Sequence, residues 1–279
     1  MKKVINPHLF DRDLEMQPVE QHVFSVRITD NWSINYAPNG GYVMAVLAKA
    51  MLQCSDKQGT PIITANYISR CQAADALIYV DLLSTSRNFT RLQARLVQDG
   101  EERVRAWGTF ASDPESGLFE SYEADPPEME AFERCIQVPK MPDLTLFDHI
   151  DLRFDPAAMD WALGKQTPSE QARSEHKGWV QFMNPRNIDI PAIVLFADAF
   201  PPCVFATRGM NTWVPTIEFS VNIRKVSASC RLKGVFRTRF ISSGLVEEDG
   251  ELWDETGTLV ALSRQIAKYR QTTYNTRLK

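Results

Sequence analysis

The first half of the chain alternates apolar and polar residues over several stretches, and one stretch between them repeats with a longer period. Alternation is typical of strands with one buried face, and it covers residues 62–70, 76–87, 89–98 and 102–112, with a further candidate strand at 21–28. After a turn cluster at 38–41 the spacing becomes helical, with one face formed by Val43, Val46, Leu47, Ala50 and Met51. The pattern predicts one helix within residues 35–54, followed by an antiparallel meander.

The second half repeats this order of elements. A short strand is expected at residues 179–184 and a helix at 190–200, where Pro201-Pro202 ends the apolar run. Four strands are then expected over 216–224, 227–244, 244–257 and 258–271, with the last hairpin turn at 254–257. The spacing agrees between the halves, since Tyr67 lies 22 positions after Ala45 and Phe219 lies 21 positions after Asp198. We interpret this agreement as a structural repeat.

A segment rich in proline and acidic residues, 113–148, separates the two halves. It has no sustained period, which is typical of a linker, although residues 128–135 could form a short helix. We expect an N-terminal domain over 1–112, a linker over 113–148 that follows the surface, and a C-terminal domain over 149–279. Each domain is predicted to be α+β, with a long helix wrapped by an antiparallel sheet. This arrangement describes a hot-dog fold, and two in tandem give a double hot-dog.

Composition excludes several classes of protein. The chain has 279 residues, a hydrophobic fraction of 44%, a charged fraction of 24% and a net charge of -4, without the clustered Lys and Arg of a nucleic-acid surface. The longest apolar run is broken by Asp198 and Pro201-Pro202, so no membrane span is expected. Five widely spaced cysteines without a C-x-x-C motif favour a reduced, cytoplasmic protein. With four histidines, neither a metal site nor a redox cofactor is expected.

One acidic residue, Asp198, lies inside the apolar run 191–205. An ionised carboxylate is costly to bury without partners, so Asp198 must be exposed, paired, protonated or functional. Thr216 and Gln265 are polar residues in similarly apolar strands and could join it in one buried polar site. The simpler interpretations are a helix-end carboxylate satisfied by backbone or solvent, an ordinary strand threonine and an outward-facing glutamine. By contrast, Glu247, Glu248 and Asp249 are expected at a hairpin tip, with no role in a site.

Short motifs in both halves resemble the double hot-dog acyl-CoA thioesterases of the type II class. The first half has Asn39-Gly40-Gly41-Tyr42 at the start of the helix, NYISR at 66–70, Arg87-Asn88-Phe89 and Gln98-Asp99-Gly100. In the second half Asp198, Thr216 and Gln265 match an Asp in the helix, a Thr that opens a strand and a Gln in the last strand. The chain departs from the pattern at Ser86, Cys71 and Glu218-Phe219, which bear on substrate preference. The resemblance covers roughly residues 15–272.

This resemblance implies hydrolysis of acyl-CoA to free acid and CoA. Asp198 would be the base, or would orient the base, while Thr216 and Gln265 hold the water that attacks the thioester. Gly40 and Gly41 open a helix whose free N–H groups could bind the oxyanion, although a turn that needs glycine explains them equally well. Arg87, Asn88 and Phe89 could contact a CoA phosphate or the pantetheine arm, or they could form a solvated strand end.

Two other functions stay open. A hot-dog hydratase or dehydratase would need a histidine beside its acid, and His176 is the only remote candidate. A non-catalytic module that binds acyl-CoA or lipid would not need the Asp, Thr and Gln. An acyl-CoA substrate is the expected partner, and a homodimer or tetramer is plausible because hot-dog sheets pair edge to edge.

Overall fold

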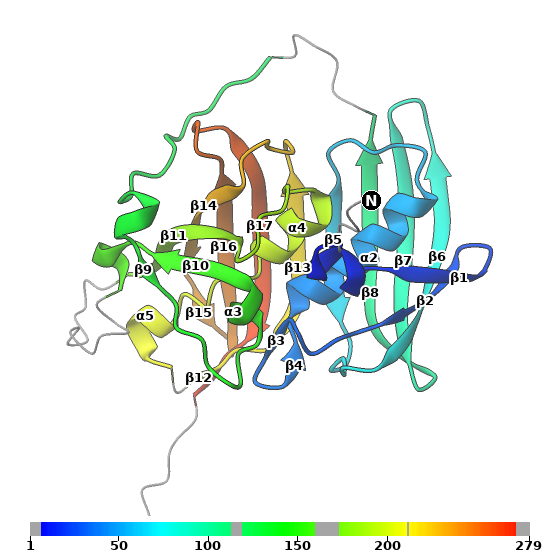
Figure 1. Cartoon of the computed structure of the whole chain (residues 1–279), viewed down its shortest axis with the longest axis horizontal. Helices are drawn as coiled ribbons and strands as arrows, with labels where there is room; N and C mark the ends of the chain where they lie inside the picture. Colours follow the sequence, from blue (N-terminus) through cyan, green and yellow to red (C-terminus); the bar gives the residue numbers. More distant parts are fainter. Residues whose placement is uncertain (1–6, 113–118, 160–172, 211, 272–279) are drawn as a thin grey trace, which may run out of the picture.

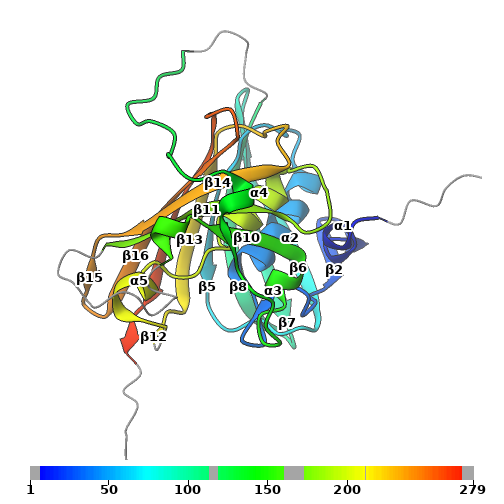
Figure 2. The same cartoon turned by 60° about the vertical axis from the view of Figure 1, so that its left-hand side comes forward.

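The computed structural model describes residues 7–112, 119–159, 173–210 and 212–271. Residues 113–118 of the expected linker lie outside these ranges. The main element is a 14-stranded sheet, and helices α2 and α4 lie next to each other on the same side of it (Figures 1 and 2). The two helices come from different halves of the chain, so their contact brings the halves together over the sheet.

The first half contains the helix and meander that the apolar pattern predicts. Short α1 (Leu9–Asp13) and long α2 (Gly40–Cys54) are its helices. Its strands are β1 (Met16–Glu20), β2 (Val23–Arg27), β3 (Ser33–Ile34), β4 (Ala37–Pro38), β5 (Ile62–Tyr67), β6 (Asp75–Thr85), β7 (Phe89–Gln98) and β8 (Glu101–Ala111). In the large sheet the order is β1-β2-β6-β7-β8-β5, while β3 and β4 pair in a separate two-stranded sheet. The pattern missed α1 and β1, which are short and carry little periodic signal.

Helix α2 is buried on almost every side, as expected for a helix that a sheet encloses. Its alanines Ala45, Ala48 and Ala50 are fully buried, and their small side chains allow the strands to approach closely. Ser55 follows the helix with extended backbone, which ends it. The helix therefore forms the centre of the first-half core and fixes the position of its N-terminal residues.

The second half has more and shorter elements than expected. Its helices are α3 (Leu146–His149), α4 (Ile190–Phe196) and α5 (Phe205–Arg208), with two short 3₁₀ turns at Phe132–Arg134 and Pro156–Ala158. Its strands are β9 (Ile136–Gln137), β10 (Ile150–Phe154), β11 (Ser174–Phe182), β12 (Thr212–Trp213), β13 (Thr216–Ile223), β14 (Arg231–Thr238), β15 (Ile241–Ser242), β16 (Leu245–Trp253), β17 (Leu259–Lys268) and β18 (Arg270–Gln271). In the large sheet they continue in the order β13-β17-β16-β14-β11-β10-β9.

The helix of the second half differs from the expectation. α4 has 7 residues against 15 in α2, and it ends before Asp198 instead of reaching residue 200. The chain leaves the helix in a turn at 197–198, and Pro201-Pro202 cannot continue it. Asp198 therefore lies just beyond the helix end, where its side chain is free to contact the first half.

The charged residues Glu247, Glu248 and Asp249 also differ from the expectation. They lie inside strand β16 and pair with β17, not at a hairpin tip. The hairpin turn is at 254–257, as predicted, and the Asp254 carboxylate stabilises it by accepting hydrogen bonds from the backbone N–H groups of Thr256 and Thr258. Alternation along β16 then places Glu248 on the same face as the buried Val246.

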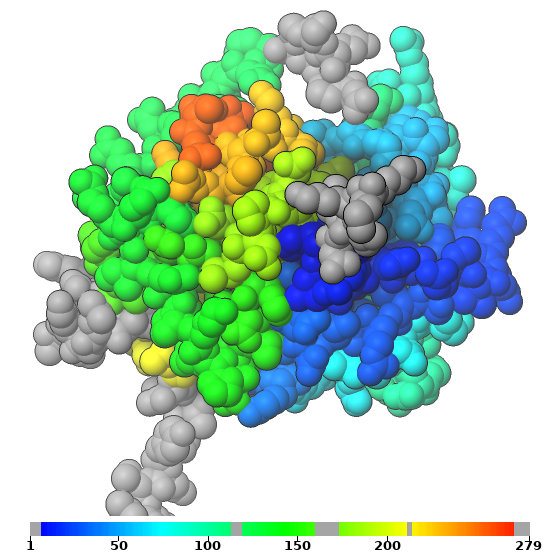
Figure 3. All heavy atoms as spheres, in the orientation of Figure 1, coloured from blue at the N-terminus to red at the C-terminus, as the bar shows by residue number. Residues whose placement is uncertain are grey.

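One antiparallel pairing joins the halves into a single sheet. Strand β5 pairs with β13, with Ala65 opposite Phe219, and the hydroxyls of Thr64 and Ser220 form a hydrogen bond of 2.9 Å across the seam. On the helix side, the α1 segment meets the loop before α4, where Arg186 forms an ion pair with Asp11 (Figure 3). The edge-to-edge pairing expected of hot-dog sheets thus occurs within one chain.

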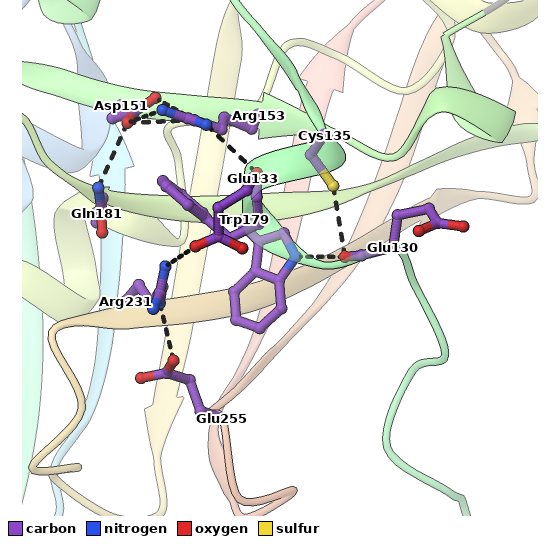
Figure 4. Close-up of polar contacts among 10 residues, drawn as sticks. Glu130, Glu133, Cys135, Asp151, Arg153, Trp179, Gln181, Arg231 and Glu255 are labelled. Carbon is purple, nitrogen blue, oxygen red and sulfur yellow. Dashed lines mark hydrogen bonds and ion pairs between the residues drawn. The ribbon is translucent and has the colours of Figure 1, made fainter.

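The described part of the acidic segment docks on the second-half sheet. Phe132 is buried beneath the guanidinium groups of Arg153 and Arg231, at 4.0 and 4.7 Å from its ring centre. The indole of Trp179 donates to the Glu130 carbonyl oxygen, and Arg231 pairs with Glu133 (Figure 4). Aromatic burial and cation–π contacts therefore hold this segment on the surface.

Candidate active site

Asp198 is held by the first residues of α2. Its Oδ2 atom accepts a hydrogen bond from the Gly41 N–H at 2.7 Å and another from the side-chain amide of Asn39 at 3.0 Å. The same amide donates to the Asp198 carbonyl oxygen at 3.0 Å. A carboxylate from the second half is thus fixed at the N-terminus of the first-half helix.

The sequence around Gly41 explains why this contact is possible. Asn39 is the N-cap of α2, where its side-chain oxygen accepts from the Tyr42 N–H, and this leaves its amide for Asp198. A Cβ atom on Gly41 would lie 2.7 Å from the Asp198 Cβ, so only glycine permits this approach. The Asn-Gly-Gly motif therefore shapes both the helix start and the cradle for the acid.

Opposing effects set the ionisation of Asp198. Burial raises its pKa to about 6, while the hydrogen bonds from Gly41 and Asn39 stabilise the charged form and limit the rise. The N-terminal end of α2 acts in the same direction as these bonds. The result is a carboxylate that is mostly ionised at neutral pH yet more basic than a solvated one.

Thr216 and Gln265 form the second part of the site. The Gln265 side-chain amide donates to the Thr216 hydroxyl. A β-bulge between Thr216 and Glu218 makes this contact possible. Phe219 is opposite Gln265, but after the bulge Thr216 is opposite Ala267. The extra residue turns Thr216 to the face of Gln265 and of the buried Ala267. The sequence pattern gives no signal for this bulge.

Tyr67 connects the seam to the helix start. It ends β5, the strand next to β13, and its hydroxyl donates to the Gly40 carbonyl oxygen at 2.7 Å. Burial raises the pKa of Tyr67 well above its usual value, and the charge of Asp198 adds to the effect. No hydrogen bond within the described ranges joins Asp198 directly to Thr216 or Gln265.

Glu248 is a functional candidate that the sequence reasoning missed. It lies directly opposite Gln265 in the β16–β17 pairing, and its Oε2 atom accepts from the Cys203 N–H at 2.6 Å. Burial raises its pKa to about 7, and the nearby charge of Asp198 contributes. Strand alternation with Val246, Gly250 and Leu252 is the signal that could have placed it on the inner face.

The other predicted site residues lie in two places. The Gly40 N–H has no acceptor among the described residues, whereas the Gly41 N–H is used by Asp198. Arg87, Asn88 and Phe89 are exposed at the β6–β7 hairpin, near the C-terminal end of α2. Since a helix of 15 residues is about 22 Å long, the structure does not bring these three residues to Asp198.

Within the described ranges, His, Cys, Asp and Glu side chains form no group of three or more that could hold a metal ion. The helices in those ranges are also too short or too polar to cross a membrane. The residues described above contribute carboxylates, hydroxyls, an amide and backbone N–H groups to the candidate site.

Family comparisons agree with this architecture half by half. The model described as "Acyl-CoA thioesterase N-terminal domain" matches residues 28–111, and that described as "Acyl-CoA thioesterase C-terminal domain" matches residues 123–268. The chain belongs to the acyl-CoA thioesterase family. No curated protein matches the sequence. The protein is therefore a thioesterase, an enzyme that hydrolyses thioesters.

Solved structures show the same fold over nearly the whole length of this thioesterase. A protein classed as thioesterase II from Thermobifida fusca YX is 25% identical, with a TM-score of 0.85 and coverage of 94% of this chain and 97% of that chain. A conserved hot-dog protein of unknown function from Alicyclobacillus acidocaldarius is 21% identical, with a TM-score of 0.85 and coverage of 96% and 100%. The acyl-CoA thioesterase II TesB2 from Mycobacterium marinum is 15% identical, with a TM-score of 0.74 and coverage of 95% and 99%.

Proposed function

We propose that this thioesterase hydrolyses acyl-CoA by a water held between Asp198 and the Thr216–Gln265 pair. The observation that carries the proposal is the half-buried Asp198 carboxylate, fixed by Gly41 and Asn39 and more basic than usual. Thr216 and Gln265 already form a hydrogen-bonded pair, so they can present a fixed oxygen to the water. Asp198 then acts as the base, or as the group that orients the base.

The Gly40 N–H is the better of the two glycine donors for the oxyanion. The Gly41 N–H is already bound to Asp198, while the Gly40 N–H is not bound among the described residues and lies at the positive end of α2. A donor of this kind typically contributes about 10²–10³ in kcat. Arg87, Asn88 and Phe89 stay candidates for the distal part of CoA, since they lie at the far end of α2.

The hydratase alternative finds less support. His176 is fully buried on β11, where burial lowers its pKa to about 4, so that it is neutral at physiological pH. A ring enclosed in the core is poorly placed to exchange protons with a substrate. Dimer or tetramer formation stays a proposal, and the β5–β13 pairing already supplies one edge-to-edge contact within the chain.

Release of CoA thiol from a panel of acyl-CoAs tests the proposal. We expect Asp198→Asn to lower kcat by roughly 10²–10⁴, the usual contribution of a general base, with the melting temperature within a few degrees. The matched control is Asp81→Asn, an exposed strand aspartate that contacts Gln93. Retained turnover in Asp198→Asn would remove this carboxylate from the mechanism, and hydration of an enoyl-CoA without thiol release would favour the hydratase.

A further inference from the structure

A small pocket lies beside Gln265, on the side of the sheet that faces α5. Its polar lining is Thr238, Glu248 and Gln265, and its apolar lining is Pro202, Val204, Val214, Val246 and Ala267. The hollow has room for about one water-sized group. Three polar groups around a space of this size match the two to four partners that a buried water needs.

The sheet register explains why these polar groups converge. Glu248 on β16 is opposite Gln265 on β17, and side chains at such positions have Cβ atoms about 5 Å apart. On the other side of β16, Arg237 of β14 is opposite Asp249, so the next residue, Thr238, lies beside Glu248. Gln265, Glu248 and Thr238 thus form a row of polar side chains across three strands. The Thr238 hydroxyl oxygen is buried and has no hydrogen-bond partner among the described residues. A bound water would supply the missing partner.

Glu248 also connects the pocket to Asp198. Its Oε2 atom accepts from the N–H of Cys203, five positions after Asp198 on the same loop. The charge of Asp198 also contributes to the raised pKa of Glu248. The polar row and the Asp198 cradle therefore belong to one continuous region around the second-half loop 197–204.

We propose that Glu248 is a second catalytic carboxylate, which accepts the proton of the attacking water in this pocket; the proposal rests on the hydrolase function above. An O–H bond of the water breaks, its proton moves to Glu248, and its oxygen bonds to the thioester carbonyl carbon. The C–S bond then breaks, and the departing CoA sulfur takes the proton from Glu248. Asp198 in this scheme orients the water and the loop, while Gln265 and Thr238 fix the water.

The charges around Glu248 suit this role. Burial raises its pKa to about 7, the Cys203 N–H opposes the rise, and the charges of Asp198 and Glu247 add to it. The Cys203 thiol is neutral, since burial raises its pKa well above the usual value. The neighbouring strands contribute Thr238 and Gln265, which do not titrate. A base is most effective when its pKa is close to the working pH, and Glu248 meets this condition.

The test compares Glu248→Gln with wild type in steady-state hydrolysis of an acyl-CoA that wild type cleaves. The amide oxygen of Gln can still accept from Cys203, so the loop stays in place while the base is lost. We expect kcat to fall by at least 100-fold with KM within about threefold. The rise of kcat with pH through about 7 should disappear, and Glu248→Asp should recover part of the loss.

The matched control is Glu251→Gln, the same change three positions later on the opposite face of β16. Glu251 accepts from Arg237 and from the indole of Trp253, away from the pocket, and its variant should keep kcat within about twofold. If Glu248→Gln keeps wild-type kcat and pH profile, the proposal is overturned and Glu248 only holds the loop. If Glu248→Gln does not fold, an unchanged pH profile in Glu248→Asp overturns it equally. A wild-type protein that cleaves no acyl-CoA would instead refute the hydrolase function itself.

Discussion

At the residue scale, Asn39 contributes two contacts with different partners. Its oxygen caps α2 at Tyr42, and its amide holds Asp198, which lies 159 positions later in the chain. The motif around it looks like a simple helix start in the sequence. The structure shows that the same residues form the cradle of the acid, so the helix cap and the candidate site are one feature.

The close contact at Gly41 gives a sharp prediction. In Gly41→Ala the new methyl group would lie 2.7 Å from the Asp198 Cβ, so the aspartate must move. Displacement of a positioned group by about 1 Å costs roughly 10²-fold, and we expect kcat to fall by about that factor. The measurement is steady-state thiol release together with thermal melting.

Gly100→Ala is the control for this change. Gly100 lies in a hairpin turn with φ of +78° and no atom within 4 Å of the added Cβ. This variant should lose about 1 kcal/mol of stability through backbone strain and keep kcat. If Gly41→Ala retained full kcat, a tight fit between α2 and Asp198 would not matter for the reaction.

At the element scale, short segments determine the positions of the candidate site residues more than the long helices and strands do. The bulge in β13 brings Thr216 beside Gln265, and the early end of α4 frees Asp198 to contact α2. The acidic segment is another case, because Phe132 and Trp179 anchor it on the second-half sheet. The bulge and the anchoring of the acidic segment depend on packing between elements, whereas Pro201-Pro202 also limits the length of α4.

The anchoring of the acidic segment can be tested with limited proteolysis. Phe132 is 8% exposed and its ring contacts the guanidinium groups of Arg153 and Arg231, whereas Phe119 in the same segment is 91% exposed. We expect Phe132→Ala to lower stability by about 2–4 kcal/mol or to release the segment locally. Cleavage between residues 119 and 135 should then become faster.

Phe119→Ala is the matched control and should change neither cleavage nor the melting temperature. Equal cleavage rates in Phe132→Ala and wild type would show that the cation–π contacts do not hold the segment. Hydrolysis should continue in both variants, because neither side chain contacts the candidate site.

At the scale of the whole molecule, the seam between the halves is also the place where the candidate site forms. The β5–β13 pairing makes one sheet, and the α2–α4 contact lies above it. Burying acids at this seam has a cost, since the pKa of Asp198 is raised to about 6 and that of Glu248 to about 7. Function and stability therefore compete at this position.

This competition predicts how stability depends on pH. For each of these two carboxyl groups, the pKa in the folded state lies above the pKa in the unfolded chain. At pH values between the two, the folded state therefore binds more protons than the unfolded state. The contribution of the two protonated carboxyl groups to stability is complete below about pH 4 and is lost as the pH rises through about 6 to 7. We expect the free energy of unfolding, measured by urea titration, to fall over this range as these two groups ionise.

The double variant Asp198→Asn, Glu248→Gln should flatten this part of the pH profile and be more stable than wild type at pH 8. An unchanged slope in the double variant would show that other groups control the pH dependence. The comparison uses stability only, so it does not depend on the identity of the substrate.

The sequence by itself determined the local elements and their order. Alternation predicted strands β5 to β8, the helical period predicted α2, and residues 254–257 predicted the last turn, because these features depend on neighbouring residues and on which face is buried. Only the tertiary structure decided what Asp198 contacts, where α4 ends, that a bulge turns Thr216 inward and that Glu248 faces Gln265. The contacts of Asp198 with Gly41, of Thr216 with Gln265 and of Glu248 with Cys203 join residues more than 40 positions apart, and no local pattern records such distances.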